Sequence, residues 1–520
     1  MPTTSLNSDV TLAKDFDEYT KHSKVSVREV QSLDFENLPF PYKVYTALEP
    51  VKLPTDFPHP TSNAIECLTK RETSGGTIDL STITELLYFS AGITKTIKYP
   101  SGETYDFRAA ACTGARYEIE VYVASGQIHG LGAGVYHFNP KDFSLRRLRD
   151  GDYRSFLYSA AGENEEILSA PVTFILTAIH WRNAWKYQAR AFRHFFWDSG
   201  TILANLCSTG ISAGLNAKVL LGFVDDHVNR LLGLNTGEET VVCLVPMSGQ
   251  GARPASLERA SPPDIMYEHR PLSKRTVEYP EIGAMHSASS LNSVNEVKSW
   301  TTTSLPKIDL RTLAREGTFP LKPLNSYPVK QLGETIIRRG STRRFSRESI
   351  PFSYLSTILQ VSTRSVPTDF LGPRGSTLIG TYVIVNAVDG IPSGGYFYNR
   401  EEESLDLLRR GDFRDTAGYL CLDQPLAADG SAVAFLMTDL ESVLEAYGNR
   451  GYRAAQLEGG IILGKMNLCA FALEIGATGI TFYDDAVTEF FSPHASRKSN
   501  ILSVVLGVPA YGKRPSFRDV

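Results

Sequence analysis

The stretch GVYHFNPKDFSLRRLRDGDYR, residues 134–154, recurs without gaps as GGYFYNREEESLDLLRRGDFR, residues 394–414. Ten positions are identical at one constant offset of 394 − 134 = 260 residues, from Gly134/Gly394 to Arg154/Arg414. A single long repeat indicates a duplicated domain, whereas a solenoid would show several repeats of about 20–50 residues. A chain of 520 residues has room for two such copies.

Two further matches extend the repeat. RAFRHFFWDSGTILANL (190–206) aligns with RGYRAAQLEGGIILGKM (450–466) at the same offset, and GFVDDHVNRLL (222–232) aligns with TFYDDAVTEFF (481–491) at 259. Apolar residues in the first pair fall at helical spacing, which predicts one long helix per copy. A mid-helix glycine costs about 1 kcal/mol relative to alanine. The recurrence of Gly200 as Gly460 therefore predicts close packing against another helix across the two copies.

Short apolar runs between the helices predict strands. EIEVYVAS (118–125) and TYVIVNAV (381–388) are rich in β-branched and aromatic residues, and GVYHF and GGYFY follow them in the chain. APVTFILTAI (170–179) and SAVAFLMTDL (431–440) are apolar runs ahead of the long helices. Strands mixed with helices in this way favour an α+β fold.

Composition excludes several classes of protein. The formal net charge is −4, so no nucleic-acid or anionic-membrane partner is expected. No apolar run approaches about 18 residues, which predicts no membrane span. The first residues, MPTTSLNSDV, contain no apolar signal core. The six cysteines form no C-x-x-C pair, which favours reduced thiols in a cytoplasmic protein.

These observations predict four segments. Residues 1–60 are an N-terminal segment, 61–250 the first copy, 251–325 a linker or wrapping arm, and 326–520 the second copy. Residues 247–310 are rich in Ser, Pro and Glu and lack periodicity, so SASSLNSVNEVKSWTTTS is expected to be the most mobile part.

Standard catalytic fingerprints are absent from the sequence. GLGAGV (130–135) has closely spaced glycines, but the strand VYHF follows them. A dinucleotide site needs glycines that open a helix, so a hairpin turn is the better interpretation. The sequence contains no phosphate-binding P-loop, no H-E-x-x-H and no G-x-S-x-G.

Three segments together resemble nitroreductase-fold flavoproteins, in particular their SagB-type dehydrogenase branch, which is also described as ThcOx-like. They are RGSTRRF (339–345), RAAACTGARYEIEVYV (108–123) and AWKYQARAFRH (184–194). YTKHS (19–23) and GFVDDHVNRLLGL (222–234) resemble that branch more weakly. The resemblance implies a nitroreductase-like three-layer α-β-α fold. The two fused copies would form an intramolecular pseudo-dimer, so the protein is expected to be a monomer.

The family resemblance implies that flavin mononucleotide (FMN) lies at the interface between two such domains. Cofactor-binding residues are then expected on both copies: Arg339, Ser341, Arg343, Thr113, Gly114, Lys513 and Arg514. Arginines suit this role because a guanidinium binds phosphate in a planar, permanently charged geometry. A stretch of small residues such as AAACTGA also permits close approach of backbone to a flat ring. The ordinary alternatives are an exposed basic turn and a loop of small residues.

Lys186 and Tyr187 match the Lys-Tyr pair that azoline-oxidising members use in catalysis. A lysine beside a flavin can transfer a proton if burial lowers its pKa. The alternative interpretation is a solvated lysine beside a core tyrosine. No metal ligand set is indicated.

The two copies differ in these motifs. In RETSGGT (71–77), Arg71 and Thr73 correspond to Arg339 and Ser341, but Gly75 replaces Arg343. Ala446-Tyr447 stands where the first copy has Lys186-Tyr187, and FLGPRGSTLIG (370–380) has lost the small-residue pattern. One composite site is therefore complete. The opposite site, with Arg71, Thr73, Arg374, Gly375, Ala446 and Tyr447, lacks both an arginine and the lysine.

The sequence therefore predicts a flavin-dependent oxidoreductase with one working site. By resemblance, the substrate is a peptide-derived or small molecule oxidised from azoline to azole. Two alternatives stay open: a general NAD(P)H-dependent reductase of nitro or quinone compounds, and a flavin-binding or inactive scaffold in a biosynthetic complex. Fold alone does not decide among them.

Overall fold

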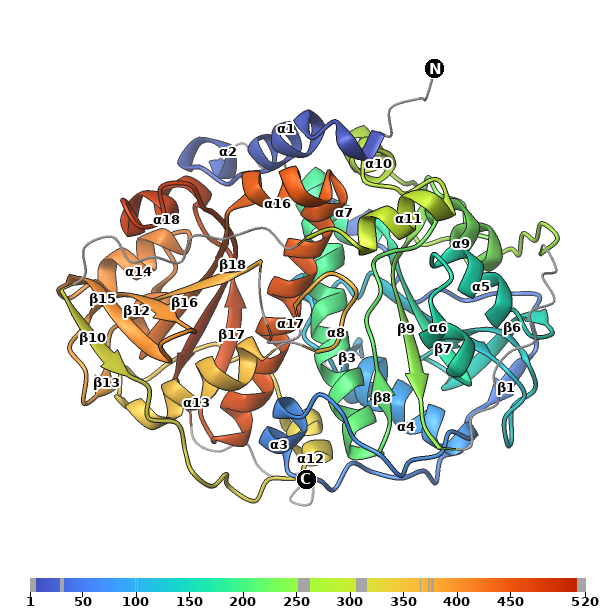
Figure 1. The fold of residues 1–520 in the computed structure, drawn as a ribbon, viewed down its shortest axis with the longest axis horizontal. Coiled ribbons are helices and arrows are strands. Elements are labelled where there is room, and N and C mark those ends of the chain that lie inside the picture. The colour runs from blue at the N-terminus through green and yellow to red at the C-terminus, as the bar shows by residue number, and fades with distance from the viewer. Residues whose placement is uncertain are drawn as a thin grey trace.

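Two seven-stranded sheets stand on either side of a central pair of long helices (Figure 1). The computed structural model describes residues 6–28, 32–98, 100, 102–250, 262–304, 316–364, 366–372, 375 and 378–511. The first sheet has the order β1-β6-β5-β4-β7-β9-β8, and the second has β10-β15-β14-β12-β16-β18-β17. The strand orders correspond one to one, so the predicted duplication and the α+β class are confirmed.

The strands of the first sheet are β1 (Pro50–Lys52), β4 (Ile119–Ser125), β5 (Gly134–Asn139), β6 (Ser144–Asp150), β7 (Val172–Ile179), β8 (Asn216–Ala217) and β9 (Glu239–Ser248). Those of the second are β10 (Gly317–Pro320), β12 (Gly380–Val385), β14 (Gly394–Asn399), β15 (Ser404–Arg410), β16 (Ala432–Thr438), β17 (Gly476–Ile480) and β18 (Ser499–Gly507). Neighbouring strands in both sheets pair antiparallel.

Helices cover both faces of each sheet. The first copy contributes α3 (Ala64–Thr69), α4 (Leu80–Ala91), α5 (Arg154–Ala160), α6 (Glu165–Ser169), α7 (His180–Tyr187), α8 (Ala191–Ser212) and α9 (Asp225–Leu232). The second contributes α12 (Leu332–Arg338), α13 (Phe352–Thr363), α14 (Arg414–Leu420), α15 (Pro425–Asp429), α16 (Leu440–Tyr447), α17 (Arg450–Ala472) and α18 (Asp484–Phe491).

Alternation along β4 shows why three layers form. Val121 and Val123 pack into the large cluster that contains the central helices. Tyr122 and Ala124 point to the opposite face, into a separate cluster with residues of α5, α6 and α9. Successive side chains of a strand face opposite sides, so a strand that is apolar throughout must be covered twice.

The long helices α8 and α17 pack against each other at two glycines. A Cβ placed on Gly200 would lie 2.4 Å from the backbone of Gly460, and one placed on Gly460 would lie 2.4 Å from the Trp197 carbonyl. No larger residue fits without moving a helix. The predicted close contact between the copies is confirmed.

Two helical arms lie across one end of the helix pair, where α8 and α17 both begin (Figure 1). They are α1 (Thr11–Tyr19) with α2 (Lys24–Arg28), and α10 (Pro280–Ala288) with α11 (Val294–Thr301). The predicted most mobile segment therefore forms helices instead, and Met285, Val297 and Trp300 are buried.

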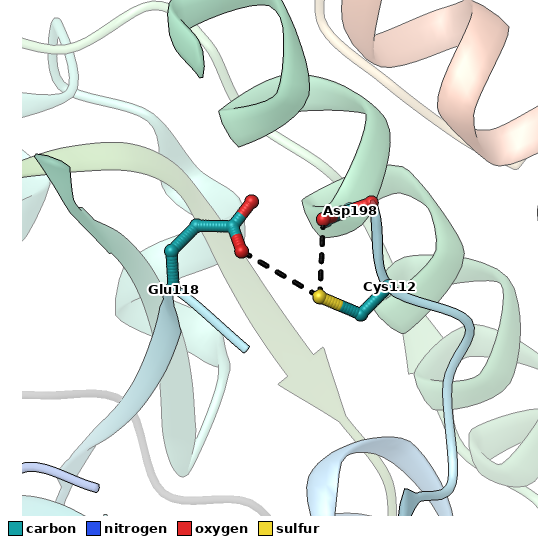
Figure 2. A group of neighbouring side chains, drawn as sticks. All are labelled: Cys112, Glu118 and Asp198. Atoms are coloured by element: carbon teal, nitrogen blue, oxygen red, sulfur yellow. Dashed lines mark hydrogen bonds between the residues drawn. The ribbon is translucent and has the colours of Figure 1, made fainter. Parts of the chain in front are cut away.

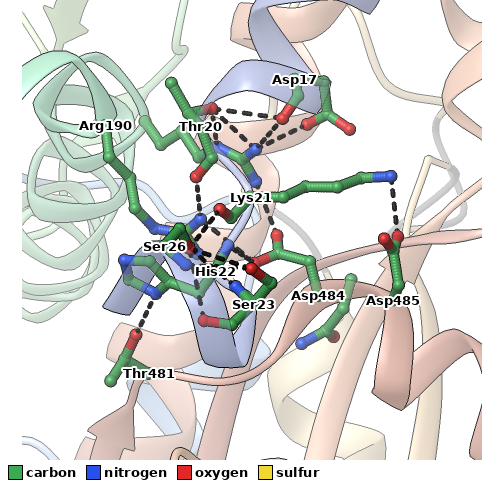
Figure 3. Close-up of polar contacts among 12 residues, drawn as sticks. Asp17, Thr20, Lys21, His22, Ser23, Ser26, Arg190, Thr481, Asp484 and Asp485 are labelled. Atoms are coloured by element: carbon green, nitrogen blue, oxygen red, sulfur yellow. Dashed lines mark hydrogen bonds and ion pairs between the residues drawn. The ribbon is translucent and has the colours of Figure 1, made fainter. Parts of the chain in front are cut away.

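Each arm makes the same backbone contact with the copy that it crosses. The His22 N–H donates to the Asp484 carboxylate at 2.8 Å, and the Leu291 N–H donates to the Asp225 carboxylate at 2.9 Å. Figure 3 shows Asp484 among the side chains of the first arm, together with Arg190. Both arms are thus parts of the repeated unit.

The two copies differ most in the segments that connect α4 with β4 in the first copy and α13 with β12 in the second. In the first copy, α4 is followed by a hairpin of β2 (Ile93–Lys98) and β3 (Thr104–Arg108). In the second, β11 (Ile350–Pro351) and β13 (Val388–Asp389) form a short parallel pair around α13, and residues 366–372 run back against the first copy.

The domain boundaries stay a prediction, although β1 and β10 place strands of both sheets before residues 61 and 326. No helix in the described part of the chain is long and apolar enough to cross a membrane. All six cysteines are free thiols.

Candidate active site between the two copies

Lys186 and Tyr187 end helix α7 at the boundary with the second copy. The Lys186 side chain is half-buried, and burial together with the nearby charges of Arg116 and Arg343 lowers its pKa. Arg343 belongs to the second copy, so the structure brings these two candidate residues together across the interface. A lowered pKa increases the neutral amine fraction, which is the form that accepts a proton.

Arg339 of the second copy reaches into the first. Its Nε and Nη2 both donate to the Ala109 carbonyl, at 3.2 and 3.0 Å. Burial lowers the pKa of Arg339 to about 10, so the side chain stays cationic at neutral pH. Arg343 is exposed, and Ser341 on the same segment is half-buried.

Four cations therefore gather here: Arg116, Lys186, Arg339 and Arg343. Among the described residues, none of them forms an ion pair with a carboxylate. Uncompensated positive charge at a partly buried interface favours an anionic ligand, and guanidinium groups suit a phosphate.

The loop with Thr113 and Gly114 packs against Tyr187. Gly114 has φ +59°, and a Cβ there would lie 2.6 Å from the Tyr187 hydroxyl oxygen. Glycine is therefore required both by the backbone conformation and by the close approach. Burial and the nearby Asp198 carboxylate raise the pKa of Tyr187, so its hydroxyl stays protonated as a donor.

Asp198 on α8 holds this loop in place. Its carboxylate accepts the Thr113 N–H at 2.8 and 3.0 Å, the Thr113 hydroxyl at 2.9 Å and the Cys112 thiol at 3.2 Å. Figure 2 shows that Glu118, which directly precedes β4, points at the Cys112 sulfur from another side. The Glu118 Oε2 lies 3.5 Å from Cys112 Sγ. Loop, strand and helix therefore meet at one buried polar cluster.

The Glu118 and Asp198 carboxyl groups are both buried, and neither pairs with a cation among the described residues. Burial and the Asp198 charge raise the pKa of Glu118 well above its usual range. Two such groups cannot both ionise at low cost, so the pair holds one proton at neutral pH.

Sequence reasoning missed both acids. Leu378 stands at offset 260 from Glu118, so the second copy keeps one carboxylate, Glu458, at the position of Asp198. Since EIEVYV is a plausible strand with either residue, only a comparison of the copies at position 118 could have indicated a special role.

The nitroreductase family model matches residues 79–250. This part of the chain is a nitroreductase-family domain. The matched residues include Thr113, Gly114, Lys186 and Tyr187.

Individual relatives support the assignment. The chain is 25% identical over 177 residues to the nitroreductase-type protein MJ1384 of Methanocaldococcus jannaschii, covering 34% of this chain and 84% of that protein. It is 26% identical over 152 residues to the microcin B17-processing protein McbC of Escherichia coli, covering 28% and 51%. It is 31% identical over 167 residues to the trifolitoxin-processing protein TfxB of Rhizobium leguminosarum bv. trifolii, covering 30% and 44%. The last two matches span about half of each relative.

A solved structure shares the whole two-copy fold. The crystal structure of a nitroreductase-type protein of Anabaena variabilis superimposes with a TM-score of 0.75 at 24% identity. The superposition covers 96% of this chain and 99% of that one. The predicted nitroreductase-like fold is thereby confirmed for both copies.

The opposite interface of the nitroreductase-family domain is built differently. Arg71 lines a pocket with Lys465, Val366 and Pro367 of the second copy. Burial lowers the pKa of Lys465 to about 7. No carboxylate pairs with Lys465 among the described residues.

Tyr447 on that side is a core residue. It is 3% exposed, and its hydroxyl donates to the Phe370 carbonyl at 3.1 Å, which fixes residues 366–372 against it. Thr73 is held through its N–H by the Asn216 side chain at 2.8 Å. Arg374 lies outside the described residues, as do Lys513 and Arg514, so their predicted roles stay predictions.

Proposed function

We propose that the protein is an FMN-dependent oxidoreductase with one working site per chain, formed jointly by the two copies. The observation that carries this proposal is the reach of Arg339 from the second copy into the first, where its guanidinium donates to the Ala109 carbonyl at 3.0 and 3.2 Å. The opposite interface has Ala446 in place of Lys186 and a buried, hydrogen-bonded Tyr447.

The residues at the interface fit a flavin with a phosphate. Arg339, Ser341 and Arg343 would hold it from the second copy, and Thr113 and Gly114 would meet it from the first, with Lys513 and Arg514 as further phosphate ligands. The unpaired cations supply the countercharge, and Gly114 lets the loop pack closely against Tyr187. Bound FMN would supply a two-electron acceptor.

Lys186 would accept the proton that leaves the substrate, and Tyr187 would bind the substrate beside it. Oxidation of an azoline ring to an azole removes a hydride and a proton from adjacent ring carbons. The neutral Lys186 amine is suited to accept that proton, because burial and two neighbouring cations lower its pKa. The Tyr187 hydroxyl, which accepts or donates no hydrogen bond among the described residues, is free to bind the substrate.

A peptide-derived azoline is the substrate class that we propose. Two relatives are named for processing the peptides microcin B17 and trifolitoxin. We further propose that the chain acts as a monomer in the cytoplasm, since the second copy already covers the surface that would otherwise pair with another chain.

A direct test is anaerobic mixing of the flavin-loaded protein with a synthetic peptide that contains one thiazoline. The proposal predicts bleaching of flavin absorbance and a product lighter by two hydrogens. Bleaching by NADPH together with turnover of menadione, but none by the thiazoline peptide, would favour the general reductase. Failure of the protein to bind FMN after reconstitution would favour the scaffold.

A further inference from the structure

Gln188 has a backbone conformation that normally requires glycine. It follows Tyr187 at the end of α7 with φ +52° and ψ −140°. In this region the Cβ of an L-residue crowds the neighbouring carbonyl groups, so glycine is strongly favoured.

The second copy uses glycine at the same place. Gly448 follows Tyr447 at the end of α16 with φ +66° and ψ −162°. Both residues close the same turn, because the Gln188 N–H donates to the Ala184 carbonyl and the Gly448 N–H donates to the Leu444 carbonyl. The fold therefore needs this turn in both copies, and glycine satisfies it.

In the described part of the chain, no structural contact of the Gln188 side chain explains why glutamine, rather than glycine, stands at this position. The side chain is half-buried, and its amide forms no hydrogen bond among the described residues. It directly follows Lys186 and Tyr187, the two residues that we place at the reacting atoms. Strain held at such a position indicates that the side chain serves the site.

We propose that Gln188 is a specificity-determining residue whose side-chain amide binds a peptide group of the substrate. This inference rests on the proposed peptide-derived substrate. A glutamine amide offers an acceptor and two donors, so it pairs with the N–H and the C=O of one peptide group. Glycine at the inactive interface and glutamine at the working one are then both explained.

The experiment compares Gln188→Gly with the unmodified flavin-loaded protein, using two probes that share one reacting ring. One probe is a thiazoline within a short peptide, and the other is free 2-methylthiazoline. We expect the variant to raise KM for the peptide probe about tenfold, the effect of one or two lost hydrogen bonds. Turnover of 2-methylthiazoline should be unchanged, and the melting temperature should rise because strain is released.

Two further variants serve as controls. Gln188→Asn should recover part of the peptide preference, because asparagine keeps an amide and tolerates positive φ. Gly448→Ala should lower the melting temperature without a change with either probe, since a Cβ there would lie 2.2 Å from the Asn7 carbonyl oxygen.

The outcomes separate the two claims. An unmodified protein that oxidises neither probe would overturn the proposed chemistry, and the peptide contact with it. Equal KM values for Gln188→Gly and the unmodified protein would overturn the role of Gln188 alone. An equal loss with both probes, in kcat rather than KM, would also contradict a peptide contact.

Discussion

Asp225 of the first copy lies 2.7 Å from the guanidinium of Arg450 in the second, and both side chains are almost wholly buried. Asp225 also pairs with Arg453 at 2.7 Å. The pseudo-symmetric partner, Asp484 of the second copy, pairs with Arg190 and Arg193 of the first at 3.2 and 3.1 Å. The two copies are thus joined twice by the same kind of buried cluster, in both cases where α8 and α17 begin.

Breaking either cluster should destabilise the whole chain. Asp225→Asn leaves two buried guanidinium groups without their anion, which typically costs about 3–5 kcal/mol. Asp484→Asn should cost a similar amount, with part of the loss relieved because Asp17 still pairs with Arg193 at 3.0 Å. Urea unfolding curves provide the measurement.

Glu163→Gln is the matched control, because it breaks a solvent-exposed pair with Lys298 that should be worth about 1 kcal/mol or less. If the three variants unfolded at the same urea concentration, the buried clusters would not hold the copies together.

The sequence predicted the long helices, the main strands and the contact of Gly200 with Gly460. These features follow from local periodicity and from a repeat at a nearly constant offset. The arms were missed because their equivalent residues His22 and Leu291 are 269 positions apart rather than 260, and because the Ser, Glu and Lys content of both arms is typical of a linker. Two helices form there because Met285, Val297 and Trp300 find partners only in the folded molecule.

The acid pair of the site could not be predicted for a related reason. Glu118 directly precedes the apolar strand β4, and Asp198 lies 80 residues further along the chain on α8, which is buried on all sides. Only the tertiary fold places both against the Cys112 sulfur. The motifs gave Lys186 and Arg343, and the family resemblance predicted that both belong to one composite site.

Lys186→Ala should slow reduction of the flavin by substrate about 100-fold, the usual effect of removing a positioned acid–base group. Flavin content and melting temperature should not change, since the equivalent residue is Ala446 and the fold does not need a lysine there. Stopped-flow absorbance with the thiazoline peptide measures the rate. Lys70→Ala, in the pocket of the opposite interface, is the control and should leave the rate of flavin reduction unchanged. An unchanged rate for Lys186→Ala would show that this lysine is only a solvated residue.

Arg343→Ala should weaken FMN binding, whereas Arg71→Ala should have little effect. A charge-assisted hydrogen bond to phosphate contributes about 1.5–3 kcal/mol, or about ten- to a hundredfold in affinity. Fluorescence titration of the flavin-free protein with FMN gives both dissociation constants. Equal losses in the two variants would mean that both interfaces bind flavin.

Glu118→Gln should change how stability depends on pH. The pKa of Glu118 is raised in the folded protein, so its proton is retained there after the unfolded chain has released it near pH 4.3. The stability linked to this group is fully present below that pH and is lost as pH rises. The variant should therefore melt at a higher temperature than the unmodified protein at pH 8 and at a similar one at pH 4.5.

Glu278→Gln removes the same charge from an exposed position and should leave the pH profile as it is. A Glu118→Gln profile parallel to that of the unmodified protein would show that the buried pair holds no extra proton.

The measurement that tests the central claim most directly is the number of flavins per chain. FMN is added in excess to the purified protein, unbound flavin is removed, and the released flavin is quantified against protein mass. One composite site predicts one FMN per chain of 57.3 kDa, with binding abolished by Arg339→Ala combined with Arg343→Ala. Two FMN per chain would contradict the account, because both interfaces would then be working sites.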